Sequence, residues 1–259
     1  MDLHNKAVKL HFDSLARKRE DYLKKNWYYH QSVENLCAFF VPEHSNVLQL
    51  GSGNGGLLAH LKPVYGVGVD ISGSRVKNAQ KKYNSLTFLN KDIQKLSIKK
   101  KFDYVICSDV IGYLSDVQQA FEQIKKVSTP QSRIIITYYN FLWEPLLILA
   151  EKIGVKFPIP PQNWLSMTDI KNLLDLAGLE VVKSGNYLLI PFYIPFLSNF
   201  INRYIARLPL IKQLCLVQYV IARTKPTLQD KRKYSVSVIL QLFLGLELEE
   251  NIFGDLLKI

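Results

Sequence analysis

Four glycines in the stretch VLQLGSGNGGLLAHL, residues 47–61, have the spacing of a loop that binds a nucleotide-type cofactor. Gly51, Gly53 and Gly56 satisfy G-x-G-x-x-G, the dinucleotide fingerprint, whereas Gly51, Gly53 and Gly55 satisfy G-x-G-x-G. Residues without side chains let the backbone turn sharply and approach a ligand closely. The loop therefore predicts a cofactor site, and its overlapping patterns leave the identity of the cofactor open.

Side chains able to handle a proton follow other apolar runs. Tyr139 and Glu144 lie in the phrase TYYNFLWEP, and His30 ends an aromatic group just before the glycine loop. We take His30, Tyr139 and Glu144 as candidate catalytic residues because ligands of open α/β sheets bind near strand ends. Each has an alternative interpretation, since tyrosine pairs are often core residues and a single histidine is often structural.

The elements that must position these residues alternate along the chain. Near-continuous β-branched runs separated by helical patterns are typical of a parallel sheet covered on both faces, and the fold class is therefore α/β, doubly wound and Rossmann-like. Residues 1–40 are expected to be helical, and residues 166–177 form a helix with a possible capping box. The predicted strands are 46–50, 65–71, 86–89, 102–108, 133–139, 179–183 and 214–222.

Domain organisation follows from this alternation. We expect one domain over 1–226, with an N-terminal helical cap over 1–44, an apolar basic insertion over 186–213 and a tail over 227–259. In LSNFINRYIARL, residues 197–208, apolar residues share one helical face, and no acidic residue occurs from Asn186 to Gln229. This helix is either interfacial, resting on anionic lipid or an apolar substrate, or packed on the domain's own sheet.

Composition limits the class of protein. The chain has 259 residues, 48% hydrophobic residues and a net charge of +11, enough apolar content for a full core. Its longest apolar runs are short and broken by proline, so we expect a cytoplasmic protein that is at most peripheral at the membrane. Three distant cysteines without C-x-x-C spacing predict neither a disulfide framework nor a metal site. The oligomeric state stays open.

The order of motifs resembles the class I S-adenosylmethionine-dependent methyltransferases. The resemblance rests on the glycine loop, GVDIS, KDI, CSDVIGYL and the closing strand pair, and covers about residues 45–113 well and the chain to Arg223 more loosely. It implies a seven-stranded, mostly parallel sheet whose last strand is antiparallel, with S-adenosylmethionine as the cofactor. No N-P-P-Y motif follows the fourth strand, where the sequence is SDVI, so a nucleic-acid substrate is disfavoured.

The resemblance also implies roles for individual residues. Asp70 corresponds to the acid that binds the ribose hydroxyls, and Asp92 to the acid that binds the adenine amino group; capping of a helix or turn is the alternative role for an aspartate at such positions. The glycines face the methionine part of the cofactor. The full set of implied cofactor residues is Gln49, Gly51, Ser52, Gly53, Gly55, Asp70, Ile71, Asp92, Ile93, Ser108 and Tyr113.

One position departs from the family pattern. Gln49 stands two residues before the first glycine, where the family usually has Asp or Glu. An amide still forms hydrogen bonds but gives no Coulombic attraction to the ammonium or sulfonium of the cofactor. This departure predicts weaker cofactor binding or a protein without turnover.

The tail carries a second resemblance. KYSVSVIL followed by ELEENIFGDLLK is similar to the opening strand and helix of family 2 glycosyltransferases, although the loop residues expected between them are missing. The likeness implies a remnant of a fused glycosyltransferase and hence a lipid-linked sugar or cell-envelope substrate.

The sequence thus predicts methyl transfer to a small-molecule or lipid-linked acceptor. An NAD-linked reductase using the same loop is an alternative, although no segment carries an evident hydride-accepting pocket. A non-catalytic cofactor-binding or membrane-associated accessory protein is the other, and it is favoured by Gln49 and the lack of an obvious base.

Overall fold

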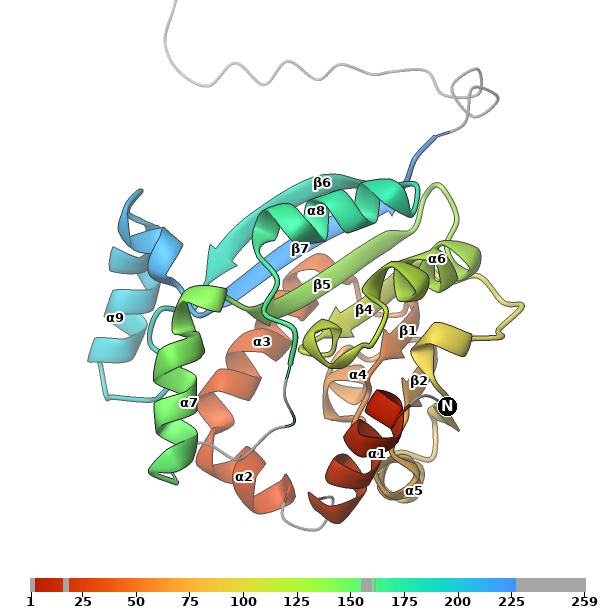
Figure 1. The fold of residues 1–259 in the computed structure, drawn as a ribbon, viewed down its shortest axis with the longest axis horizontal. Helices are drawn as coiled ribbons and strands as arrows, with labels where there is room; N and C mark the ends of the chain where they lie inside the picture. The colour runs from red at the N-terminus through yellow and green to blue at the C-terminus, as the bar shows by residue number, and fades with distance from the viewer. Residues whose placement is uncertain (1–2, 16–18, 155–159, 161, 227–259) are drawn as a thin grey trace, which may run out of the picture. The chain divides into compact units, whose positions relative to one another are not determined.

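A seven-stranded sheet forms the centre of the computed structural model, which describes residues 3–15, 19–154, 160 and 162–226 (Figure 1). The strand order is β3-β2-β1-β4-β5-β7-β6, and β7 runs antiparallel to β5 and β6 while the other pairs are parallel. The strands are β1 (Asn46–Leu50), β2 (Tyr65–Asp70), β3 (Thr87–Asn90), β4 (Tyr104–Ser108), β5 (Arg133–Tyr139), β6 (Leu179–Tyr187) and β7 (Val217–Thr224). The predicted doubly wound sheet with an antiparallel last strand is confirmed.

Helices cover both faces of this sheet and extend beyond it. The α-helices are α1 (Leu3–Leu15), α2 (Arg19–Lys25), α3 (Trp27–Phe40), α4 (Gly56–His60), α5 (Gly73–Lys82), α6 (Val117–Val127), α7 (Glu144–Lys152), α8 (Met167–Leu176) and α9 (Leu197–Arg203). Short 3-10 helices are η1 (Ile93–Lys95), η2 (Ile111–Tyr113), η3 (Phe141–Trp143), η4 (Ile205–Arg207) and η5 (Ile211–Leu214). All these elements belong to one compact unit, Met1–Lys225. Residues 227–259, which carry the glycosyltransferase-like pattern, lie outside the described residues.

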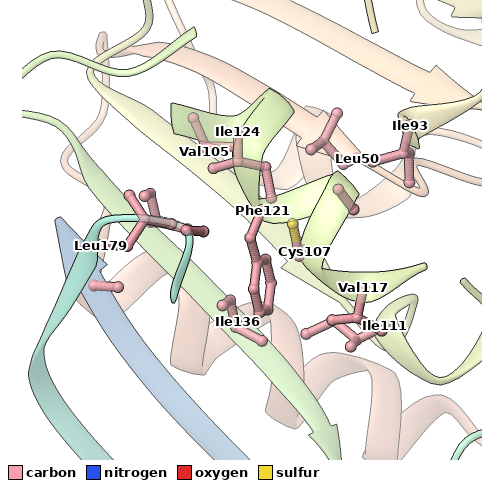
Figure 2. Packing of buried hydrophobic residues seen from close by; sticks show 14 of the residues in the cluster. Leu50, Ile93, Val105, Cys107, Ile111, Val117, Phe121, Ile124, Ile136 and Leu179 are labelled. Carbon is pink, nitrogen blue, oxygen red and sulfur yellow. The ribbon is translucent and has the colours of Figure 1, made fainter. Parts of the chain in front are cut away.

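Strand alternation divides the core into two layers. Val105 and Cys107 of β4 pack with Phe121 and Ile124 of α6 and with α8, as Figure 2 shows for the α6 side. Ile106, between them in sequence, points to the opposite layer, which contains side chains of α3, α4 and α5. Because successive side chains of a strand face opposite sides, an unbroken apolar run such as VIC is buried on both.

The helices that follow β1 and β4 lie on opposite faces of the sheet. Leu57 and Leu58 of α4 belong to the α3 and α5 layer, whereas Phe121 of α6 belongs to the other layer. The strands β1 and β4 are neighbours, so the chain diverges between their carboxyl ends. Such a switch point is where open α/β sheets bind ligands.

Several elements near the carboxyl half differ from the predictions. β6 extends to Tyr187 rather than residue 183, and β7 begins at Val217 rather than 214 because residues 211–214 form η5. The carbonyl oxygens of Leu214 and Cys215 are occupied by the side chains of Trp143 and Asn140, which holds this turn out of the sheet. Helix α7 was not predicted, since EPLLILAEK has no clear polar side, and much of its apolar surface is exposed.

Candidate functional site

The glycine loop connects β1 to α4 in the backbone conformation that its sequence predicts. Gly51 and Gly53 have φ angles of 73° and 54°, in the left-handed region that favours glycine. A methyl group on Gly51 would lie 2.6 Å from Val110, so packing also excludes a side chain there. A methyl group on Gly53 would have no neighbour within 4 Å. Gly51 is therefore fixed by packing, while Gly53 leaves open space above the loop.

Asp70, at the carboxyl end of β2, holds this loop in place. Its Oδ2 accepts a hydrogen bond from the Gly53 amide at 2.8 Å, and its Oδ1 accepts one from the Ser72 amide at 2.9 Å. The residue is 5% exposed, yet it lines a cavity together with Ile71, its neighbour in the chain. Ser72 is the residue that caps α5, so Asp70 is not the helix cap considered as its alternative role.

Asp92 caps the short helix η1 and also reaches helix α1. Its Oδ1 accepts from the Gln94 amide at 3.0 Å, and its Oδ2 accepts from Asn5 Nδ2 at 3.0 Å. Asn5 also donates to Gln94 Oε1 at 2.9 Å. One oxygen of Asp92 thus has the capping role that we considered as an alternative. The residue also lines the same cavity as Asp70 and Ile93.

The cleft at the switch point has two lobes. The smaller lobe, of about 70 Å³, is lined by Asp70, Ile71, Asp92 and Ile93 among others. The larger lobe, of about 190 Å³, is lined by the glycine loop and by side chains from α2, α3, β4 and β5. The residues that line both lobes are Phe12, Gly51, Arg75, Asp109 and Tyr113. The lobes therefore meet above Gly51.

Helix α1, part of the expected N-terminal helical cap over 1–44, lines the smaller lobe with Asn5, Val8 and Phe12. The Arg75 guanidinium lies 4.0 Å from the centre of the Phe12 ring, and Asp13 accepts hydrogen bonds from the Ser72 hydroxyl and the Ser74 amide. The only sequence signal was the helical character of the first residues, because a contact between α1 and α5 spans about 60 positions. Burial raises the pKa of Asp13, and its hydrogen bonds to Ser72 and Ser74 outweigh this effect, so the pKa is lowered overall.

The larger lobe brings together most of the predicted residues. It is lined by His30 and Tyr139 from the catalytic set and by Gln49, Gly51, Ser52, Gly53, Ser108 and Tyr113 from the cofactor set. Gly55 caps α4 beneath the loop, where a methyl group would lie 2.6 Å from the Phe88 ring, and it lines neither lobe. Glu144 begins α7 and lines neither lobe either, because the chain turns away through η3 after β5.

Asp109 is a site residue that the sequence analysis passed over. It has a φ angle of 52°, an unusual conformation for a residue with a side chain, and it lies where the two lobes meet. Its Oδ2 accepts from the Tyr29 hydroxyl at 2.6 Å, and its Oδ1 accepts from the Thr137 hydroxyl at 3.4 Å. The available sequence signal was its place directly after β4.

Two tyrosines beside Asp109 keep their protons. Burial, followed by the charge of Asp109, raises the pKa of Tyr29 well above its ordinary range. Burial and Asp109 raise the pKa of Tyr139 in the same direction, and the two rings have centroids 5.8 Å apart. Near neutral pH both phenols therefore keep their protons, and Tyr29 donates its proton in a hydrogen bond to the Asp109 carboxylate.

Several described residues that line the larger lobe have buried polar atoms that form no hydrogen bond. Among the described residues, Gln49 Oε1, Ser52 Oγ and Asn54 Oδ1 are buried side-chain atoms without a hydrogen bond, and all three residues line this lobe. Buried acceptors without partners are unfavourable, so a ligand that donates hydrogen bonds would satisfy them. Glu34 lines the same lobe, and a methyl group on Gly56 would lie 3.7 Å from its Oε1. Burial raises the pKa of Glu34, while His60 lowers it by a smaller amount.

The fold is Rossmann-like, and the cleft at its switch point is a candidate site for a nucleotide-type cofactor. A family model described as a methyltransferase domain matches residues 42–171, and the chain belongs to this methyltransferase family. Protein 235L of Invertebrate iridescent virus 6, provisionally named as a methyltransferase, is 25% identical over 120 residues, which are 44% of this chain and 45% of that one. The chain thus spans less than half the length of this relative.

Solved structures show the same fold. Magnesium protoporphyrin IX methyltransferase from Synechocystis PCC 6803, solved with bound SAH, superposes with a TM-score of 0.61 at 20% identity, covering 86% of this chain and 100% of that chain. A SAM-dependent methyltransferase from Thermotoga maritima gives a TM-score of 0.65 at 16% identity, with 84% and 100% covered. At these identities the likeness concerns the fold.

Proposed function

We propose that the protein transfers a methyl group from S-adenosylmethionine to a small-molecule or lipid-linked acceptor. The observation that carries this proposal is the pairing of Asp70 and Asp92 in one lobe with the open glycine loop in the other. The adenosine part would bind in the smaller lobe, with Ile71, Ile93 and Tyr113 beside it. The cofactor supplies a methyl group already activated by its sulfonium.

The amino-acid part would bind in the larger lobe, where this chain places its negative charge differently from the family pattern. Gln49 offers a buried oxygen without a partner, and Glu34 of α3 lies beside the start of α4. A carboxylate near an ammonium group in a partly buried site contributes a substantial Coulombic attraction. We therefore expect Glu34, which lines the same lobe as Gln49, to supply the carboxylate that the family usually has at position 49.

The acceptor would enter beside Asp109, Tyr29, Tyr139 and His30. Because the two phenols stay protonated, Asp109 and His30 are the groups beside them that can accept a proton from the acceptor if one must be lost. Tyr29 and Thr137 fix the orientation of its carboxylate, and positioning contributes strongly to a transfer between two bound reactants. The acids in this lobe suit an acceptor atom that is neutral, or that becomes neutral by giving a proton to one of the carboxylates before it attacks the methyl group.

Calorimetry with S-adenosylmethionine, its demethylated product and NAD tests the proposal directly. We expect both S-adenosyl compounds to bind and NAD not to bind. Binding of NAD alone would favour the reductase, and binding of neither class would leave an accessory protein. S-adenosylmethionine could bind without transfer of its methyl group to any compound in extracts of small molecules or lipids. The protein would then be better described as a cofactor-binding protein without turnover.

A lipid-linked or cell-envelope acceptor is the more specific form of this proposal. It is supported by the apolar insertion between β6 and β7 and by the glycosyltransferase-like pattern of the tail, which lies outside the described residues. Incubation with radiolabelled cofactor and membrane extracts, followed by solvent partition, would locate the labelled product. Label found only in the aqueous phase would restrict the acceptor to small molecules.

A further inference from the structure

The segment between β6 and β7 exposes an unusual amount of apolar surface. Phe196 is 91% exposed and Leu210 is 82% exposed, values typical of side chains surrounded by solvent. We call the exposed apolar residues of this segment the insertion surface; they are Phe192, Tyr193, Phe196, Leu197, Phe200, Tyr204, Leu208, Leu210 and Leu214. So many exposed apolar side chains in one segment are typical of a binding site for a partner or a membrane.

Helix α9 turns its polar side inward and its apolar side outward. Asn202 Oδ1 accepts from the amides of Leu189 and Ile190 at 2.8 and 2.9 Å, and its Nδ2 donates to the Ile190 carbonyl at 2.9 Å. Ser198, fully buried, bonds to the backbone of Phe192 and Ile194. The helix is therefore held by hydrogen bonds. Of the predicted apolar face, Leu197, Phe200, Tyr204 and Leu208 are exposed, and Ile201 and Ile205 are half-buried.

The predicted helix over 197–208 is also divided. α9 ends at Arg203, and η4 follows from Ile205. Phe200 and Tyr204 keep their rings in contact, with centroids 5.4 Å apart, so the exposed apolar face continues across the break. Figure 1 shows α9 beyond the ends at which β6 finishes and β7 begins.

Positive charge accompanies this apolar face. Arg203, Arg207 and Lys212 are exposed within it, and no acidic residue occurs from Asn186 to Pro226. Large aromatic and aliphatic side chains mixed with cations, without anions, are the combination that binds the interface of an anionic bilayer. We propose that the insertion surface docks on an anionic lipid membrane.

Docking at this surface would place the bilayer next to the first turn of α3. Tyr28 donates to Asn199 at 3.0 Å and accepts from Asn202 at 3.1 Å, and the rings of Trp27 and Tyr193 have centroids 5.2 Å apart. The next residues of α3 include His30, which lines the larger lobe, and Tyr29, whose hydroxyl donates to Asp109 of the cleft. The proposal itself concerns binding and holds whether or not methyl transfer occurs.

Sedimentation of the full chain with lipid vesicles tests whether the insertion surface binds anionic membranes. We expect the protein to pellet with vesicles that contain phosphatidylglycerol, to pellet much less with phosphatidylcholine alone, and to be released by salt, which screens charges beyond about 10 Å at 0.1 M. The double variant Arg203→Glu/Arg207→Glu should lower the apparent affinity at least about 10-fold. Phe200→Ser should lower it by about 10-fold through loss of inserted apolar area.

Matched control variants distinguish binding through the insertion surface from nonspecific binding through other charged or apolar residues. Lys77→Glu/Lys81→Glu reverses two exposed cations on α5, and Phe39→Ser removes an aromatic side chain that is 77% exposed on α3. Both should bind as the wild type does, and circular dichroism should show all variants folded. Absence of pelleting by the wild type, or equal pelleting by Arg203→Glu/Arg207→Glu, would overturn the proposal. So would a dimer in solution that Phe200→Ser dissociates, because a second copy would then occupy the surface.

Discussion

At the scale of single residues, Asp70 has two tasks. Its carboxylate holds the amide of Gly53, and it also lines the smaller lobe of the cleft. A residue that is 5% exposed and accepts two backbone hydrogen bonds is well ordered before any ligand arrives. The ligand would therefore meet a carboxylate that is already in place.

Replacing Asp70 by alanine should weaken binding of S-adenosylhomocysteine by about 2–3 kcal/mol, the scale of charge-assisted hydrogen bonds. The core does not depend on this side chain, so the variant should fold, with a lower melting temperature because the loop loses its brace. Calorimetry measures the affinity and circular dichroism the fold. Unchanged affinity in the folded variant would remove Asp70 from the site.

Glu34 and Gln49 can be tested against each other. Glu34→Gln should weaken S-adenosylmethionine binding by roughly 5- to 30-fold because the larger lobe loses a carboxylate near the ammonium group. Adding Gln49→Glu to this variant should recover most of the affinity, since the charge returns at the position that is usual in the family. The single change Gln49→Glu should tighten binding at least about twofold.

The matched control for this pair is Glu122→Gln, an exposed carboxylate on α6 outside the cleft. It should leave the affinity unchanged. If Glu34→Gln binds as tightly as the wild type, Glu34 does not compensate for Gln49, and the ammonium group is held by uncharged acceptors alone.

At the scale of elements, two glycines of the β1-to-α4 loop differ in their surroundings: one is limited by packing and the other borders the open cleft. Gly51 lies against Val110, whereas Gly53 faces open space, although both have positive φ angles. The same substitution should therefore have different consequences at two positions only two residues apart.

Gly53→Ala should cost about 1 kcal/mol of stability from backbone strain alone and should abolish tight binding of S-adenosylhomocysteine, because the methyl group projects into the cleft. Gly51→Ala should cost more, by a further 1–3 kcal/mol or so, because Val110 must move. Chemical denaturation gives the two free energies of unfolding. A Gly53→Ala variant that is less stable than Gly51→Ala would contradict this assignment.

At the scale of the whole molecule, the hydrogen bond from Tyr29 to Asp109 joins the N-terminal helices to the central sheet. Folding holds the phenol proton more tightly than the unfolded chain does, since the pKa of Tyr29 is raised above its ordinary value of 10.0. Its contribution to stability is complete below this ordinary value. It is lost as the pH rises from there toward the raised pKa, because the unfolded chain then releases the proton first.

Tyr29→Phe should therefore reduce the dependence of stability on pH in the alkaline range. The free energy of unfolding of the wild type should fall more steeply above about pH 10 than that of the variant. At neutral pH the variant should be less stable by about 1–2 kcal/mol, because Asp109 loses a donor. Parallel curves for the two proteins would show that Tyr29 does not keep its proton preferentially in the fold.

The proposed membrane contact of the insertion also belongs to this scale. Among the described residues, none of the helices combines the length and the apolar character that crossing a bilayer requires. The proposed docking on lipid would involve residues of the insertion and the first turn of α3.

The sequence by itself determined the sheet and the glycine loop. Apolar runs such as RIIITYY identify strands because both faces of a parallel sheet are buried, and the loop glycines follow from a local backbone requirement. Asp70 was singled out through the resemblance to the methyltransferases, at the end of the predicted strand over 65–71. These features depend on neighbours close in sequence, and the structure brings them together as predicted.

Only the tertiary structure placed Glu34 beside the glycine loop and Tyr29 against Asp109, contacts that join α3 to distant strands. It also left Glu144 outside both lobes, because the path of the chain after β5 is set by Asn140 and Trp143. For the insertion, the sequence pattern revealed an apolar face but not its direction. The direction of that face depends on which side chains of α9 form hydrogen bonds with buried backbone groups. Asn202 and Ser198 do so here, and the polar side of the helix therefore faces inward. A buried backbone group without a hydrogen bond costs more free energy than leaving apolar side chains exposed.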